Sequence, residues 1–216
     1  MKEKFFSELF GTGFLVMIVL GSGIMAQNLY PGQIGAALLA NSLATGAGLF
    51  VLIQSLGPIS GCHINPVVSL VEMLWGNLSG KELGLYVLAQ FLGAQLGIFL
   101  THLMFRLPII QIATTDRSGA HLFVSEIVAT FGLLGVIALS GRKHVEFAPL
   151  SIAAYITSAY WFTSSTSFAN PAVTYARMFT DTFGGMSPMN FLPLCLAQIL
   201  GALAAWFFLR KSRPTQ

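Results

Sequence analysis

The chain has 216 residues, of which 55% are hydrophobic and only 9% are charged, and its mean hydropathy is +0.74. Soluble domains carry about 25% charged residues, so this composition excludes an ordinary soluble enzyme or binding domain and indicates a membrane protein. The net charge of +3 does not point to nucleic acid, because in a membrane chain the position of the basic residues matters more than their sum.

Six apolar stretches are each about long enough to cross a hydrocarbon core of about 30 Å as a helix. They cover residues 5–26, 34–57, 83–105, 121–141, 147–164 and 189–210. The sequence shows none of the alternation of apolar and polar residues that a membrane-spanning strand needs. We therefore predict an all-α membrane protein. The first stretch is expected to be a retained span, because its apolar run is too long for a signal peptide and no cleavage site follows.

Basic residues gather in the connections at one end of the predicted spans. Eight of them fall there: Lys2, Lys4, Lys81, Arg142, Lys143, Arg210, Lys211 and Arg213. The opposite loops hold only Arg106 and Arg117. The positive-inside rule then predicts both termini in the cytoplasm. We expect a multi-pass protein of the cell (plasma or inner) membrane.

Three landmarks recur along the chain in the same order, which indicates an internal duplication. Ser7-Glu8 returns as Ser125-Glu126, Asn65-Pro66 returns as Asn170-Pro171, and the segment 88–94 returns as 196–202. Each half contains three spans, and an odd number places the second copy upside down in the membrane. The sequence predicts one transmembrane domain over residues 1–216, built from inverted repeats of about 1–110 and 118–216.

Between the second and third spans of each half lies a segment too apolar for a loop and too short to cross. These segments are 60–76 and 163–180. Irregular backbone is tolerated at membrane depth only where it is buried in protein or lines a wet cavity. Asn is a strong N-cap and Pro favours the first helical position, so each Asn-Pro pair predicts the start of a re-entrant half-helix.

Because the halves are inverted, the two half-helix starts are expected to meet near the middle of the membrane. Asn65 and Asn170 would then face one space, each accepting a backbone N–H with its oxygen and offering its NH2 group to a passing water or hydroxyl. Each helix N-terminus adds about half a positive charge that repels cations. The two boxes therefore predict a pore for neutral solutes; their residues are Asn65, Pro66, Val67, Asn170, Pro171 and Ala172.

Several motifs together resemble the aquaporin, or major intrinsic protein, superfamily over nearly the whole chain. In order they are SELFGTGFLV, GPISGCHINPVVSL, LAQFLGA, SEIVATFGLLG, APLSIAAY and NPAV. The resemblance implies six tilted helices with two half-helices, and homotetramers in the lipid bilayer with one pore per subunit. It implies neither enzymatic activity nor a cofactor.

The chain departs from the family pattern at both boxes. Val67 stands where the family has Ala, which is expected to be tolerated at an overpacking cost of about 1–3 kcal/mol. Val173 stands where the family usually has the Arg of its narrow selectivity filter. Loss of the Arg removes a fixed charge and five donors, so we expect a wider and less polar filter.

The remaining filter positions are carried over from the resemblance by their distance from the boxes. They are Thr45, Ser167 and either Ser158 or Tyr160, depending on whether one counts back from Asn170 or forward from Ala148-Pro149. The amphipathic ring of Tyr160 favours it slightly.

A wide filter favours water together with glycerol-type polyols and oxyacids such as arsenous acid. The stretch AYWFTSSTSFANPAVTYAR followed by FTDTF is similar to a bacterial branch encoded among arsenic-resistance genes, which implies arsenous acid or methylated arsenicals as solutes. The alternative function is an ion-coupled secondary transporter, since such transporters also use inverted repeats and broken helices.

Arg177 lies one helical turn beyond Val173 and could take over from the missing charge. We expect it to pair instead with Asp181 at i,i+4 on the surface. A position facing the outer vestibule of the pore is the alternative.

Four further residues are candidates for the pore wall or for support of its loops. Glu8 and Glu126 are ionisable groups inside spans and thus potential proton carriers, but the resemblance implies that they accept backbone N–H groups of the re-entrant segments. His63 has no neighbouring ligand spacing for a metal, so we expect it to fix the loop. Cys62, the mirror of Ser167, is expected to pack as a small residue, with a pore-facing thiol as the alternative.

Overall fold

The computed structural model describes residues 1–140 and 145–210, and every regular element in these ranges is a helix. The α-helices are α1 (Lys2–Val16), α2 (Ser22–Leu29), α3 (Ile34–Ser60), α4 (Pro66–Leu74), α5 (Gly80–Met104), α6 (Ala120–Ser140), α7 (Ala148–Phe162), α8 (Pro171–Arg177) and α9 (Phe191–Leu209). A π-helical turn, η1 (Met17–Gly21), joins α1 to α2, and the 3₁₀ turns η2 (Val145–Phe147) and η3 (Pro188–Asn190) precede α7 and α9. The predicted all-α architecture is confirmed.

Within the described residues, five helical segments are long and apolar enough to cross a membrane. They are Lys2–Leu29, Ile34–Ser60, Gly80–Met104, Ala120–Ser140 and Pro188–Leu209. The sixth predicted span, 147–164, contains α7, which has only 15 residues. It is shorter than predicted because the backbone is already extended at Thr163, where the second re-entrant segment begins. The basic residues Arg142, Lys143, Lys211 and Arg213 lie outside the described residues.

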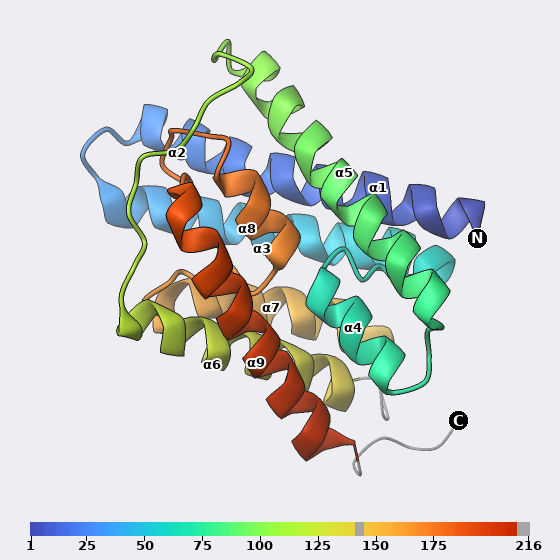
Figure 1. Ribbon diagram of the computed structural model, residues 1–216. Coiled ribbons are helices and arrows are strands. Elements are labelled where there is room, and N and C mark those ends of the chain that lie inside the picture. Colours follow the sequence, from blue (N-terminus) through green and yellow to red (C-terminus); the bar gives the residue numbers. More distant parts are fainter. Residues whose placement is uncertain (141–144, 211–216) are drawn as a thin grey trace.

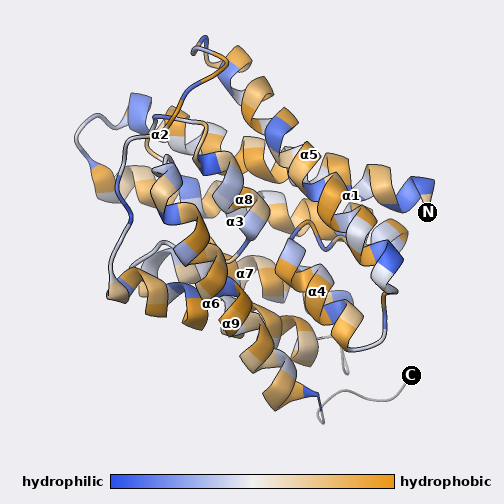
Figure 2. Cartoon of the chain, viewed as in Figure 1, coloured by the Kyte–Doolittle hydropathy of each residue, from blue (hydrophilic) through white to orange (hydrophobic). Residues whose placement is uncertain are grey.

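The distribution of side chains is the reverse of that in a soluble protein. Large apolar residues are exposed at helical spacing, for example Leu88, Leu92, Leu96 and Leu100 on α5. Glu8, Gln90, Glu126 and Gln198 are fully buried. Figure 2 shows apolar residues along the length of the helices. The bundle therefore presents apolar surfaces suited to lipid and keeps its polar groups inside.

The helices pack in two matching sets. The longest pairings place α1 along α5 in the first half and α6 along α9 in the second, while α4 and α8 are the short helices between them (Figure 1). A Cβ atom on Gly93 of α5 would lie 2.2 Å from the Leu9 carbonyl oxygen, and one on Gly201 of α9 would lie 2.4 Å from that of Ile127. Each half thus contains the same close helix crossing, made possible by a glycine.

The π-helical turn η1 interrupts the first span and packs against α3. A π turn leaves a backbone carbonyl without its usual helical donor. The Asn41 side chain of α3 donates its amide to the Val19 carbonyl oxygen at 2.7 Å and to Ser22 Oγ at 2.9 Å. A buried polar side chain therefore fixes the irregular turn against α3.

We predict that Gly93→Ala lowers stability by about 1–3 kcal/mol, because the added methyl group would push α1 away from α5. The matched control is Gly84→Ala on the same helix, where an added Cβ has no neighbour within 4 Å. That control should leave stability unchanged or raise it by up to about 1 kcal/mol. Thermal unfolding in detergent measures both variants, and equal midpoints would contradict the close crossing.

Candidate functional site

Two half-helices begin at the predicted Asn-Pro pairs. Asn65 and Asn170 both have extended backbone, with φ of −159° and −156°, and each precedes a Pro at the first turn. Asn65 Oδ1 accepts the Val67 N–H at 3.1 Å, and Asn170 Oδ1 accepts the Ala172 N–H at 2.9 Å. Both asparagines are therefore side-chain N-caps of α4 and α8.

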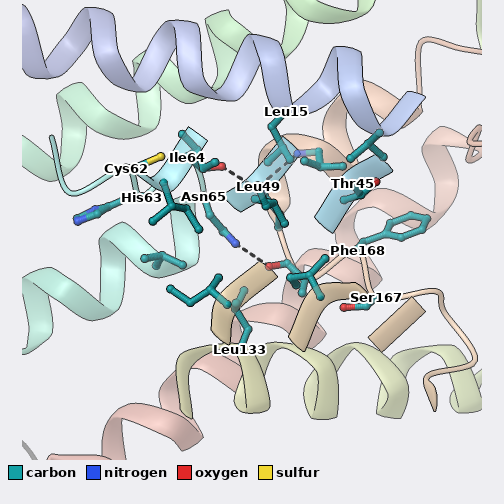
Figure 3. A pocket seen from close by; sticks show the side chains of 18 of the residues that line it. Leu15, Thr45, Leu49, Cys62, His63, Ile64, Asn65, Leu133, Ser167 and Phe168 are labelled. Atoms are coloured by element: carbon teal, nitrogen blue, oxygen red, sulfur yellow. Dashed lines mark hydrogen bonds between the residues drawn. The ribbon is translucent and has the colours of Figure 1, made fainter. Parts of the chain in front are cut away.

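The two boxes are also hydrogen-bonded to each other. Asn65 Nδ2 donates to the Ala169 carbonyl oxygen at 2.7 Å, and Asn170 Nδ2 donates to the Ile64 carbonyl oxygen at 2.8 Å (Figure 3). The sequence interpretation, which left each NH2 group wholly free, is wrong in this respect. One N–H of each amide holds the opposite loop, so a single N–H of each remains for another acceptor.

The segments that lead into the half-helices have an unusual backbone at matching places. Cys62 and Ile64 have φ of 48° and 42°, and Ser167 and Ala169 have φ of 52° and 46°. These residues stand three and one positions before each Asn. Left-handed backbone costs on the order of 1–3 kcal/mol at a residue other than glycine, so surrounding contacts must hold both loops.

Glu8 of α1 supplies these contacts for the first loop. Its Oε1 accepts the His63 N–H at 2.9 Å and the Ser60 hydroxyl at 2.7 Å. Its Oε2 accepts the Ile64 N–H at 2.6 Å and an N–H of Gln90 Nε2 at 2.8 Å. The buried carboxylate therefore receives four hydrogen bonds, two of them from the backbone of the loop.

Glu126 of α6 does the same for the second loop. Its Oε1 accepts the Phe168 N–H at 2.9 Å and the Ser165 hydroxyl at 2.5 Å. Its Oε2 accepts the Ala169 N–H at 2.9 Å and an N–H of Gln198 Nε2 at 2.6 Å. The pattern of donors around Glu8 is thus repeated around Glu126.

The two glutamines join the carboxylates to the half-helices. Gln90 Nε2 also lies 2.9 Å from Ser69 Oγ of α4, and Gln198 Nε2 lies 2.9 Å from Thr174 Oγ1 of α8. All three landmarks that repeat in the sequence, the Ser-Glu pair, the Asn-Pro box and the Gln segment, therefore meet in one network in each half.

A cavity of about 260 Å³ lies between the half-helices and the long helices. Its wall is largely apolar, with contributions from Leu15, Leu49, Ile53, Leu133, Ile137, Ile152 and Ile156. Polar atoms enter the wall through the loops and the Asn boxes (Figure 3). Because a water occupies about 30 Å³ of liquid, the cavity has room for several waters or one small polyol.

Four of the carried-over filter positions line this cavity: Thr45, Tyr160, Ser167 and Val173. Thr45 Oγ1 lies 3.2 Å from the Tyr160 hydroxyl oxygen. Ser158 is absent from the described lining; its side chain is exposed and donates to the Tyr155 carbonyl oxygen at 2.8 Å. Of the two alternatives left open by the sequence, Tyr160 is the one on the cavity wall.

Cys62 and His63 both line the cavity at the first loop. His63 Nδ1 lies 3.0 Å from Ser69 Oγ, and its ring centroid lies 4.9 Å from that of Tyr86. Tyr86 donates its hydroxyl to the Ser60 carbonyl oxygen at 2.7 Å. These contacts tie the loop to α4 and α5.

The expected pair of Arg177 with Asp181 is wrong. Asp181 Oδ1 accepts the backbone N–H and the hydroxyl of Thr114, at 2.9 Å and 3.0 Å. Arg177 is buried, lines the cavity and donates from Nη1 to the Gly184 carbonyl oxygen at 2.9 Å. Its guanidinium carbon lies 3.9 Å from the centre of the Phe168 ring. Sequence reasoning missed Phe168, because nothing but its place before the box marks it.

A model for the family described as "Major intrinsic protein" matches residues 1–169. The chain belongs to the major intrinsic protein family. Over 204 residues it is 48% identical to the aquaglyceroporin AqpS of Rhizobium meliloti (strain 1021), covering 94% of this chain and 87% of that relative. It is also 33% identical over 165 residues to aquaporin Z of Rhodopseudomonas palustris, covering 69% of this chain and 68% of the relative.

The fold of this family member also matches a solved structure. The X-ray structure of the aquaglyceroporin from Plasmodium falciparum superimposes with a TM-score of 0.74 at 20% sequence identity, covering 97% of this chain and 96% of the other. The predicted aquaporin-like architecture is confirmed by this match, and the protein is a multi-pass membrane channel rather than an enzyme.

We predict that Glu126→Gln destabilises the protein by at least about 1–3 kcal/mol, because the new NH2 group would face backbone donors in place of an acceptor. Glu3→Gln, at an exposed position of α1, is the matched control and should leave stability unchanged. Thermal unfolding in detergent compares the two. A Glu126→Gln protein as stable as the wild type but altered in the pH dependence of transport would assign Glu126 to proton transfer instead.

Proposed function

We propose that the protein is a passive channel for water and small uncharged solutes with a wide selectivity filter. The observation that carries the proposal is the cavity in which two half-helix N-termini meet and place a few donors in an apolar wall. Its membership of the major intrinsic protein family supports the same function.

The proposed pore selects against charge through its backbone. The N-termini of α4 and α8 each carry about half a positive charge, and little water is present to screen it. The remaining amide N–H of Asn65 and of Asn170 can each donate to the oxygen of a water or a hydroxyl. A neutral solute can therefore accept hydrogen bonds in the pore, whereas a cation is repelled by the positive N-termini of α4 and α8.

Val173 makes the proposed filter wide. Valine has no donor and no charge, so Thr45, Tyr160 and Ser167 supply the polar groups of the filter. A wider opening suits glycerol-type polyols, and also oxyacids such as arsenous acid or methylated arsenicals. The similarity to a protein named aquaglyceroporin supports the polyols.

Ion-coupled transport is less well supported. A coupled transporter needs a group near the middle of the membrane that binds and releases an ion during its cycle. The buried carboxylates of Glu8 and Glu126 each accept four hydrogen bonds, two of which hold a loop backbone. Release of these contacts in every cycle would undo the pore wall, which favours a channel.

The proposal includes a homotetramer in the cell membrane with both termini in the cytoplasm. The basic residues of the connections support this orientation. The exposed apolar faces of the helices suit both lipid and a neighbouring subunit. Each subunit is one channel domain, in which the repeats of about 1–110 and 118–216 enclose a single pore.

Stopped-flow light scattering of proteoliposomes tests the function. After a gradient of glycerol or of arsenous acid is applied, the vesicles should shrink and then rapidly re-swell. With an impermeant sugar they should shrink and stay shrunken. Shrinkage without re-swelling would indicate a water channel and contradict the wide filter.

We predict that Val173→Arg lowers glycerol flux by at least about tenfold and changes water flux much less, because the guanidinium fills the opening and adds donors. Val173→Ala is the control and should keep the glycerol flux, since it leaves the opening free. Unchanged glycerol permeation in a folded Val173→Arg protein would show that residue 173 does not line the filter.

A further inference from the structure

Arg177 is a buried charged residue in the wall of the proposed pore. It lies one helical turn beyond Val173, about 6 Å farther along α8 at about 1.5 Å per residue. Only 4% of its surface is exposed, and it lines the same cavity as Thr45 and Tyr160. A charged side chain at this depth is costly, so its retention at the pore suggests a function.

The guanidinium is only partly satisfied by protein. Nη1 donates to the Gly184 carbonyl oxygen, but Nε is buried without a hydrogen-bond partner among the described residues. No ion pair of Arg177 is present in that part of the chain. Because Arg stays protonated, the cavity carries a fixed positive charge that no carboxylate neutralises by direct contact.

Phe168 and the loop after α8 hold the guanidinium in place. The ring of Phe168 lies against Arg177, and Arg117 approaches the same ring at 5.3 Å. Arg117 Nε donates to the Gly185 carbonyl oxygen at 3.1 Å, next to the Gly184 carbonyl that Arg177 uses. Burial, together with repulsion from Arg177, lowers the pKa of Arg117 to about 10. Both arginines therefore contact Phe168, but only Arg177 lines the cavity.

The inverted repeat gives Arg177 a counterpart of opposite charge. Arg177 follows Asn170 by seven residues, and Glu72 follows Asn65 by the same number. Both side chains are buried and line the cavity. Since α4 and α8 run away from the meeting point in opposite directions, the two charges lie about 10 Å along their half-helices, on opposite sides of the boxes. Arg177 and Glu72 therefore occupy matching places in the two repeats, and both line the same cavity.

We propose that Arg177 is a specificity-determining residue of this channel: its fixed charge, one turn beyond the wide filter, excludes the cations that Val173 would admit. This inference rests on the proposed channel function. In the proposed channel, the width and the charge of the pore, which a filter Arg sets together, are set by two separate residues. Val173 sets the width of the pore, and Arg177 sets its charge.

Potassium efflux from KCl-loaded proteoliposomes, with glycerol re-swelling measured on the same preparations, tests the proposal. Arg177→Gln removes the charge but keeps a donor, and should raise potassium permeability by at least about tenfold while glycerol flux stays within about twofold. Arg177→Lys keeps the charge and should remain tight to potassium. Arg117→Gln, which removes the other cation at Phe168, is the matched control and should also remain tight.

An Arg177→Gln protein that passes glycerol but is as tight to potassium as the wild type would overturn the proposal. An equal potassium leak in Arg117→Gln would overturn it as well, because the leak would then follow from the shared support rather than from the pore charge. If wild-type vesicles do not re-swell in glycerol, the result contradicts the proposed channel function itself, and with it the role of Arg177.

Discussion

The pore depends on two buried carboxylates that accept backbone N–H groups. Glu8 and Glu126 each receive two such bonds from a loop buried among the helices, where a backbone group needs a partner in the protein or in a wet cavity. An unsatisfied backbone group there costs several kcal/mol, so the loops could not enter the bilayer without these partners. Two of the left-handed residues, Ile64 and Ala169, are held directly by these bonds.

The rest of the site follows from this support. Once both loops are fixed, Asn65 and Asn170 can each bridge to the opposite loop, which aligns the starts of α4 and α8 on one cavity. The close crossings at Gly93 and Gly201 bring the helices that carry Gln90 and Gln198 near enough to complete both networks. The wall therefore presents a few ordered donors in apolar surroundings, an arrangement that favours neutral polar solutes.

Much of this architecture could be predicted from the sequence because its signals are repeated. The Ser-Glu pair, the Asn-Pro box and the Gln segment recur in register, and each Asn-Pro pair has one simple structural meaning, a capped helix start. The contacts made by individual side chains were harder to predict. The choice between Ser158 and Tyr160 depended on a count across a shortened segment, and the long side chain of Arg177 could reach either Asp181 or the cavity. The filter roles of Thr45, Tyr160, Ser167 and Val173 stay predictions, although all four line the cavity.

The proposed channel is an open pore that the solute crosses without a cycle of conformational change. The dependence of the initial rate of glycerol influx on the glycerol concentration tests this claim most directly, measured on wild-type proteoliposomes at zero membrane potential. A pore that is always available predicts a rate that rises in proportion to the concentration and does not respond to sodium or proton gradients. A rate that saturates, or that accelerates with an imposed ion gradient, would contradict the account and indicate coupled transport.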